Sequence, residues 1–172
     1  LRSTLDANST LPYTVARNTI SDDMAKMAIN LCYRLETDGV TAVPVHSVGP
    51  TEWDPEAGHT RGIISLKNAA QLAGLGNIGK NTLLVNREYG NMIWLSAILV
   101  AEDLEPDAVA EYGTCPPTCR RCAEACPIQA LDGEGGIRRS ECWDFAFGDE
   151  PGGWRIKCFK CRNACPNKLG VR

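Results

Sequence analysis

The sequence lacks three features that would place it in large classes of protein. No apolar run approaches the roughly 20 residues of a membrane-spanning helix, and the longest, Met92 to Ala101, predicts a buried strand. The N-terminus carries no secretory signal. The net charge of −3 leaves no basic excess of the kind that nucleic-acid-binding domains carry. We therefore expect no membrane partner, and charge gives no reason to expect a nucleic-acid partner.

Cysteine, in contrast, is abundant and unevenly placed. Eight of the nine cysteines lie between residues 115 and 165, in runs with gaps of two or three residues. Small secreted proteins that depend on disulfides spread their cysteines along the chain, whereas this clustering is typical of metal ligation. We therefore expect a metal centre and a cytoplasmic location. Cys32 falls on the apolar side of a predicted helix, and we expect it to be a small buried hydrophobic residue.

The cysteine-rich end is also the basic end of the chain. Residues 1–114 contain 8 Lys and Arg against 14 Asp and Glu, whereas residues 115–172 contain 10 against 7. A 4Fe–4S core bound by four thiolates carries a net negative charge, so nearby cations stabilise it and raise its reduction potential. The alternative, that surface basic residues fall there without a role, stays open.

Two segments of the cysteine region repeat one pattern. Residues 119–127 and 158–166 both read C-x-basic-C-x-x-A-C-P. A duplicated half-site of this kind is what a pseudo-twofold module with two clusters leaves in a sequence. In two-cluster ferredoxins the cysteine before proline in each run ligates the other cluster, and we expect the same crossed ligation here.

Crossed ligation predicts two sets of four ligands. The first cluster takes Cys115, Cys119, Cys122 and Cys165, and the second takes Cys142, Cys158, Cys161 and Cys126. Two spacings depart from the usual pattern, because three residues separate Cys115 from Cys119 and Cys142 lies 16 residues before Cys158. Zinc sites also use C-x2-C pairs, so zinc stays an alternative, although it does not need the C-x2-C-x3-C-P run twice.

Residues 74–81 form a glycine-rich segment, GLGNIGKN. It satisfies the dinucleotide pattern G-x-G-x-x-G and nearly satisfies the phosphate loop, but both motifs need a strand before the loop and a helix after it. Here the pattern predicts a helix over residues 65–73 and a strand over 83–85. We therefore expect the glycines to permit a close backbone approach or a tight corner rather than nucleotide binding.

The first 110 residues predict a mixture of helices and strands. Residues 1–20 have no clear period and predict an irregular segment. A helix is predicted from Ser21, with apolar residues at helical spacing from Met24 to Leu35. Strands are predicted over residues 40–45 and 92–101, a long loop over 47–62 and an acidic linker over 102–113.

These elements predict an α+β core over residues 1–110, followed by a ferredoxin-like double-cluster domain over residues 111–172. The chain begins with Leu1 rather than Met. We therefore expect a fragment or a processed form in which the α+β core is incomplete at its N-terminus.

Three blocks, in this order, resemble the epoxyqueuosine reductase family: residues 73–82, residues 86–90 and the two cysteine runs. The similarity covers residues 60–170, and reductive dehalogenases are similar in general plan. The resemblance implies a nitroreductase-like α+β sandwich that holds cobalamin, beside a module with two 4Fe–4S clusters that pass electrons to cobalt. It also implies that Gly76, Lys80 and Asn81 contact the corrinoid. A ferredoxin or flavodoxin would be the redox partner, and tRNA is the substrate of the family.

The sequence departs from the family at one point. The family reductase has an acidic proton donor just before the glycine block, whereas residues 60–68 contain no Asp or Glu. We therefore expect a stand-alone relative of the reductase, with its catalytic residues unassigned. One function is a redox enzyme whose clusters feed a bound cofactor such as a corrinoid. The alternatives are a ferredoxin-like electron carrier without a second cofactor and a structural metal module.

Overall fold

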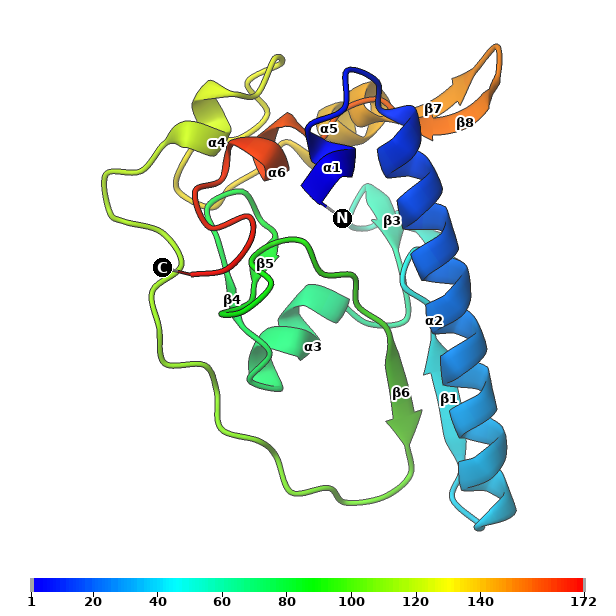
Figure 1. Ribbon diagram of the computed structural model, residues 1–172. Helices are drawn as coiled ribbons and strands as arrows, with labels where there is room; N and C mark the ends of the chain where they lie inside the picture. Colours follow the sequence, from blue (N-terminus) through cyan, green and yellow to red (C-terminus); the bar gives the residue numbers. More distant parts are fainter. Residues whose placement is uncertain (1, 172) are drawn as a thin grey trace.

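The computed structural model describes residues 2–171, in which one long helix and several short ones accompany four two-stranded sheets (Figure 1). The helices are α1 (Arg2–Leu5), α2 (Leu11–Thr37), α3 (Leu66–Leu72), α4 (Arg121–Glu124), α5 (Arg139–Ala146) and α6 (Lys160–Ala164). The strands are β1 (Ala42–Val45), β2 (Glu52–Asp54), β3 (His59–Arg61), β4 (Asn77–Ile78), β5 (Leu84–Val85), β6 (Ala97–Val100), β7 (Phe147–Glu150) and β8 (Gly153–Ile156). The mixture of helices and strands agrees with the expected α+β class.

The N-terminal part is dominated by α2, which begins well before the predicted start. Pro12 lies in its first turn, where the missing N–H group leaves no intrahelical bond unmade. The prediction of an irregular segment over residues 1–20 is therefore wrong. Ser21 is not an N-cap but a buried residue of the helix, and its hydroxyl accepts a hydrogen bond from Ser47 Oγ at 3.0 Å. None of the described helices has the length and apolar character needed to cross a bilayer.

The buried face of α2 uses small residues where it packs on β1. Ala28 and Cys32 are buried, so the expected role of Cys32 as a small hydrophobic residue is confirmed. Met27 and Leu31, predicted on the same face, are 71% and 47% exposed. The prediction failed there because helical spacing alone does not reveal which apolar residues the neighbouring strand covers.

Two antiparallel pairs accompany α2. In the first, β1 pairs with β6 so that Ala42 lies opposite Val100. The strands predicted over residues 40–45 and 92–101 are both present but shorter, as Ala42–Val45 and Ala97–Val100. In the second, β2 and β3 form a hairpin inside the predicted loop over residues 47–62, held by an ion pair from Arg61 to Asp54 at 3.1 Å.

The glycine-rich segment forms the predicted corner between a helix and a strand. Helix α3 precedes it, β4 lies within it, and β5 follows it. A Cβ atom at Gly76 would collide with the carbonyl oxygen of Val85, so the close backbone approach expected there is confirmed. The acidic segment over residues 102–113 forms no helix or strand, as expected. Asn77 on β4 holds it by donating to the carbonyl oxygens of Ala110 and Tyr112, at 3.0 and 2.8 Å.

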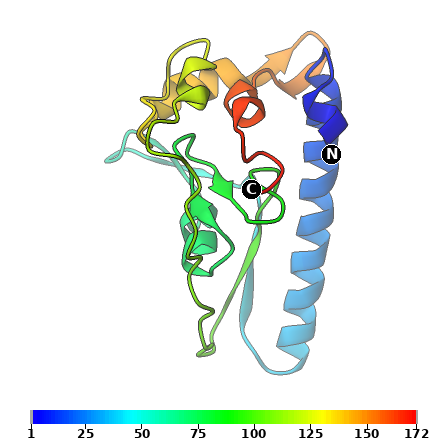
Figure 2. The same ribbon diagram turned by 60° about the vertical axis from the view of Figure 1, so that its left-hand side comes forward.

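The C-terminal segment returns to the β4–β5 region, as Figures 1 and 2 show. The N–H group of Val171 donates to the carbonyl oxygen of Arg87 at 2.8 Å. At the other end of the chain, Leu5 and Tyr13 pack against Ile156 in one buried cluster. The predicted domain boundary at residue 110 stays a prediction, and residues from both sides of it contribute to this cluster.

Candidate metal centre

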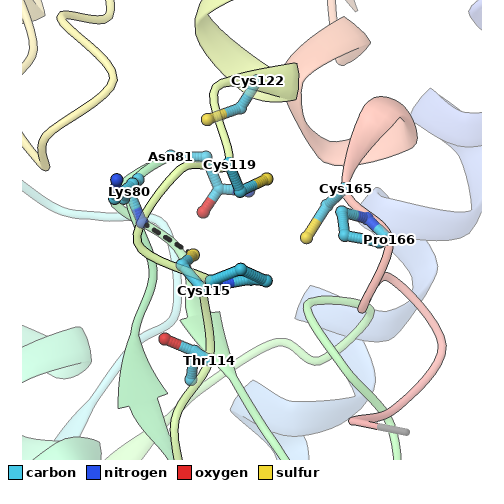
Figure 3. A pocket seen from close by; sticks show the side chains of 9 residues that line it. Lys80, Asn81, Thr114, Cys115, Cys119, Cys122, Cys165 and Pro166 are labelled. Carbon is cyan, nitrogen blue, oxygen red and sulfur yellow. Dashed lines mark hydrogen bonds between the residues drawn. The ribbon is translucent and has the colours of Figure 1, made fainter.

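Four cysteines surround a single cavity, three from the two repeats and one, Cys115, from just before the first repeat (Figure 3). Its lining consists of Cys115, Cys119, Cys122, Cys165, Lys80, Asn81, Thr114, Pro116 and Pro166. Cys119 and Cys122 come from the first run, Cys115 comes from just before it, and Cys165 comes from the second run. The structure therefore brings together the residues expected to hold the first cluster, and we call them the first cysteine group.

Local backbone geometry places the sulfurs of the first cysteine group. A turn in which the Cys119 N–H donates to the carbonyl oxygen of Pro116 at 3.0 Å takes up the longer gap after Cys115. Cys122 lies in the single turn of α4, and Cys165 directly follows α6 with an extended backbone. Cys122 and Cys165 are buried, whereas Cys115 and Cys119 are half-buried. The group thus has an inner and an outer side.

The other four cysteines, Cys126, Cys142, Cys158 and Cys161, form the second cysteine group. Cys142 lies on α5 and Cys161 on α6, and the β7–β8 hairpin occupies the insertion between Cys142 and Cys158. Burial raises the pKa of the Cys142 thiol, and the neighbouring Cys126 and Cys158 raise it further. Cys126, from the first run, is thus an electrostatic neighbour of residues of the second set.

Two thiols in each group have a raised pKa: Cys122 and Cys165 in the first, and Cys142 and Cys161 in the second. Burial, and then Cys158 and Cys142, raise the pKa of Cys161 to about 11. In the first group burial raises the pKa of Cys122 and Cys165, and the neighbouring Cys115 and Cys119 add to both shifts. A bound cation reverses this balance, because it stabilises the thiolates that otherwise repel one another.

The glycine-rich loop supplies one wall of the cavity. The backbone N–H of Lys80 donates to Cys115 Sγ at 3.4 Å, and Lys80 Nζ donates to the carbonyl oxygen of Pro117 at 2.7 Å. Asn81 is only 4% exposed. Gly76 lies against Val85 instead and is not part of the lining. A corrinoid contact by Gly76, Lys80 or Asn81 stays a prediction.

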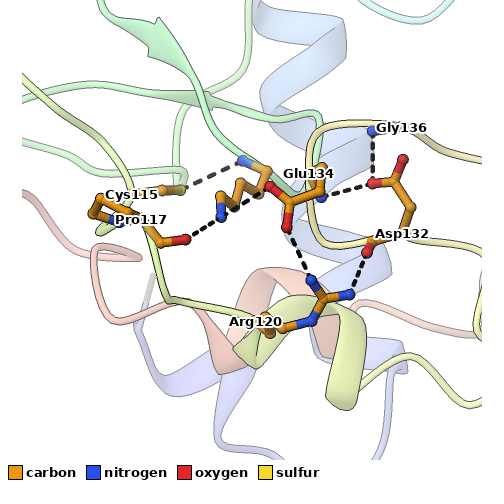
Figure 4. Close-up of polar contacts among 7 residues, drawn as sticks. Cys115, Pro117, Arg120, Asp132, Glu134 and Gly136 are labelled. Atoms are coloured by element: carbon orange, nitrogen blue, oxygen red, sulfur yellow. Dashed lines mark hydrogen bonds and ion pairs between the residues drawn. The ribbon is translucent and has the colours of Figure 1, made fainter.

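An ion-pair network fastens this wall to the cysteine loop (Figure 4). Glu134 pairs with Lys80 Nζ at 3.4 Å and with Arg120 at 2.9 Å. The carboxylate of Asp132 accepts hydrogen bonds from the N–H groups of Glu134 and Gly136, which hold its pKa below the usual range. The sequence analysis missed this network, although two acids among the glycines of residues 132–136 were a visible signal.

A buried cation beside the second group was also missed. Arg162 follows Cys161 and is 8% exposed, with its guanidinium 5.5 Å from the ring centre of Trp94. Its Nη1 has no hydrogen-bond partner among residues 2–171. The positive charge lowers the pKa of Cys161 against the effect of burial. The signal was present in the repeat, because the first run has Ala123 at the matching position.

Comparisons with known proteins agree with this architecture. No family model matches the chain. It is 34% identical over 122 residues to the epoxyqueuosine reductase of Lactococcus garvieae, which covers 65% of this chain and 34% of the relative. It is 29% identical over 140 residues to the tetrachloroethene reductive dehalogenase of Desulfitobacterium hafniense, covering 78% and 23%. The chain spans about a third of the length of the curated epoxyqueuosine reductases that it matches.

Solved structures show the same fold. The epoxyqueuosine reductase of Streptococcus thermophilus superposes with a TM-score of 0.62 at 24% identity, over 91% of this chain and 40% of that one. The enzyme of Bacillus subtilis gives 0.62 at 23% identity, over 86% and 38%. In sequence and in fold, the chain is a relative of the epoxyqueuosine reductases, as its motifs predict.

Proposed function

We propose that this chain is the electron-transfer part of an iron–sulfur reductase. It binds two 4Fe–4S clusters, one at each cysteine group, and relays electrons from a ferredoxin- or flavodoxin-type donor to a bound cofactor of the corrinoid type. The single observation that carries the proposal is the arrangement of the first group, in which Cys165 of the second run shares a cavity with Cys115, Cys119 and Cys122.

The residues present fit an iron–sulfur cluster. Such clusters are held by four cysteine thiolates and supply one-electron transfer. The first group offers four sulfurs around one space, and burial of Cys122 and Cys165 keeps water from its inner side. The Lys80 N–H donates to Cys115 Sγ, and hydrogen bonds to ligand sulfurs set the potential of a cluster.

Zinc fits the same residues less well. Zinc draws its ligand sulfurs to about 2.3 Å from one ion, so all four sulfurs would have to converge. Among the residues that the structure describes, no three His, Cys, Asp or Glu side chains form a group around a single metal ion, and this observation does not separate zinc from iron. The preference for iron comes from the C-x2-C-x3-C-P run, which occurs twice and which zinc sites do not need. The four sulfurs of the first group line one cavity, and a sulfide-bridged iron core is held by four thiolates around one space.

The relatives support the reductase part of the proposal. They are epoxyqueuosine reductases and a tetrachloroethene reductive dehalogenase. A further structural neighbour is an epoxyqueuosine reductase crystallised with an epoxyqueuosine-modified tRNA stem loop. Because residues 60–68 contain no Asp or Glu, an acid from this segment does not donate a proton in the reaction of this chain. We therefore propose a reductase that uses a different proton source.

One observation favours an electron carrier without a second cofactor. Lys80 and Asn81, which the resemblance assigns to a corrinoid, both line the cysteine cavity. Lys80 is further engaged by Pro117 and Glu134. If cobalt analysis of protein from a corrinoid-supplied host finds none while both clusters cycle, the carrier is the correct function. Cobalt bound in proportion to protein supports the reductase.

Anaerobic purification followed by iron and sulfide analysis tests the clusters themselves. Two 4Fe–4S clusters require about eight irons and about eight sulfides per chain. The reduced protein should show electron paramagnetic resonance (EPR) signals from two interacting clusters. About four irons would leave a single cluster, and zinc in place of iron would contradict the proposal.

A further inference from the structure

Asn81 has a buried amide nitrogen without a partner. The side chain is 4% exposed, and its Nδ2 atom has no hydrogen-bond partner among residues 2–171. The amide cannot simply be turned round, because its Oδ1 accepts a hydrogen bond from the N–H of Leu83 at 3.2 Å. Buried donors are nearly always paired in folded proteins, so this nitrogen indicates a missing acceptor.

Asn81 lines the cavity of the first cysteine group, and this cavity is the space in which we place the missing acceptor. The other side chains around this space include the four thiols of the first cysteine group (Figure 3). Thiolate and sulfide sulfurs are anionic acceptors, and a hydrogen bond to a charged group is stronger than one between neutral groups. The orphan nitrogen and the sulfur set therefore match in chemistry.

The neighbouring backbone is shaped for the same approach. A Cβ atom at Gly79 would lie 3.4 Å from Cys115 Sγ and 3.2 Å from Asn81 Oδ1, so glycine leaves room for both. The next residue, Lys80, directs its backbone N–H at Cys115 Sγ. Residues 79–81 thus bring one backbone donor and one side-chain donor to the cysteine cavity.

We propose that Asn81 donates an Nδ2 hydrogen to a sulfur of the cluster held by the first cysteine group and raises its reduction potential. The inference rests on the proposed two-cluster function. Reduction adds one electron to the cluster and breaks no bond to Asn81. The donor stabilises the more negative, reduced form more than the oxidised form, so the potential rises. Asn81 is thus a residue that tunes the cluster rather than one that transfers a proton.

An EPR-monitored redox titration of Asn81→Leu tests the proposal. Loss of the donor is expected to lower the reduction potential of one cluster. At a fixed solution potential its oxidised-to-reduced ratio should rise about tenfold, which for one electron corresponds to a potential lower by about 59 mV. The other cluster should keep its potential. The matched control is Asn77→Leu on the same hairpin, because the amide of Asn77 is already paired with Ala110 and Tyr112. That variant should leave both potentials unchanged.

A second pair of variants covers the case in which leucine prevents cluster assembly. Asn81→Ala removes the donor without added bulk, whereas Asn81→Ser keeps a short hydroxyl donor. The potential of the serine variant should lie between those of the wild type and the alanine variant. Electron–nuclear double resonance of the reduced protein should lose one exchangeable proton coupling in Asn81→Ala.

The outcomes separate this inference from the function on which it rests. Wild-type protein with two clusters, and equal potentials in the wild type, Asn81→Leu and Asn81→Ala, would overturn the role of Asn81 alone. An equal shift in Asn77→Leu would do the same, because it would trace the effect to the hairpin. Wild-type protein without clusters would overturn the proposed function, and the role of Asn81 with it.

Discussion

The two cysteine groups share a sequence repeat but have different surroundings. The first group is closed by the glycine-rich loop, which brings the buried amide of Asn81 and the backbone N–H of Lys80. The second group has a buried cation, Arg162, next to Cys161. Duplication therefore accounts for six of the eight cysteines, because Cys115 and Cys142 lie outside both repeats. The electrostatic environment of each group comes from side chains that the two repeats do not share.

Backbone donors do not distinguish the two groups. The Lys80 N–H lies 3.4 Å from Cys115 Sγ, and the Ala130 N–H lies 3.2 Å from Cys126 Sγ. The side chains do distinguish them, because a buried guanidinium stabilises added negative charge more than a neutral amide does. The cations near the first group, Lys80 and Arg120, are both paired with Glu134. We expect the second cluster to have the higher potential.

The largest expected effect comes from exchanging a crossed ligand. Cys165→Ser should remove the cluster of the first group and Cys126→Ser that of the second, because each residue lies with the cysteines of the opposite run. Iron should fall from about eight to about four per chain in either variant.

The surviving EPR signal identifies which cluster is lost in each case. The signal left in Cys165→Ser should keep the higher potential expected for the second group. If each variant instead loses the cluster of its own run, the assignment of the two groups is wrong.

The second prediction concerns the metal-free protein, whose free energy of unfolding should depend strongly on pH because of a thiol in the second group. The pKa of Cys161 is raised from 9.0 to about 11. A raised thiol pKa stabilises the fold at pH values below 9, and this stability is lost as the pH rises from 9 to 11. At about 1.4 kcal/mol per pKa unit, the loss is about 3 kcal/mol.

Urea unfolding of chelator-treated, reduced protein between pH 8 and 11 measures this loss. The cluster-loaded protein should not show it, because its thiols are already thiolates bound to iron. In the metal-free form, Cys161→Ser should make the unfolding free energy fall less steeply between pH 9 and 11. If it falls as steeply as in the wild type, another group titrates in this range.

The cysteine groups could be predicted from sequence because their signal is local. Spacing and the proline after each run indicated both ligand sets, and the structure brings Cys165 to the cavity of Cys115, Cys119 and Cys122. The corner after α3 was predictable for the same reason, because glycine lacks a Cβ atom and so permits a close backbone approach. Cluster ligation itself stays a prediction that iron analysis must test.

Features that depend on distant contacts could not be predicted in the same way. The position of Asn81 on the cavity wall depends on packing of residues 79–81 against Cys115, 34 residues further along the chain. The hairpin of β2 and β3 has no alternating apolar pattern, because its strands are mostly exposed. Helix α2 was placed too late because Pro12 and the Ser, Thr and Asn residues of 1–20 suggested an irregular segment, although Leu11, Val15 and Ile20 share one face of the helix. The burial of Tyr13 and Thr14 depends on the distant β8 region.

The third prediction sharpens the contrast between the side chains of the two groups. Arg162→Leu should lower the potential of the second cluster, because a buried cation no longer offsets the electron that reduction adds. An interaction with a charged group is worth about 2 kcal/mol. At a fixed solution potential, the oxidised-to-reduced ratio of the second cluster should therefore rise about thirtyfold. The first cluster should keep its potential. Redox titration with EPR detection measures both at once.

The control for this change is Arg34→Leu, which removes a cation from the exposed end of α2. It should alter neither potential. If Arg34→Leu and Arg162→Leu shift both clusters equally, the effect is one of net charge rather than of a buried cation. The proposed difference between the two groups would then be wrong.

The smallest effect is expected from the one cysteine outside both groups. Cys32 is 3% exposed and lies on the buried face of α2. Cys32→Ala removes a buried sulfur and should lower the free energy of unfolding by about 1 kcal/mol. Iron content and both potentials should stay at wild-type values, because the residue contributes packing and not ligation. A loss of iron in Cys32→Ala, measured beside Cys165→Ser and Cys126→Ser, would mean that cluster content follows the stability of the whole fold. The losses in the two ligand variants would then no longer identify separate sites, and the distinction between the groups would have to rest on their potentials alone.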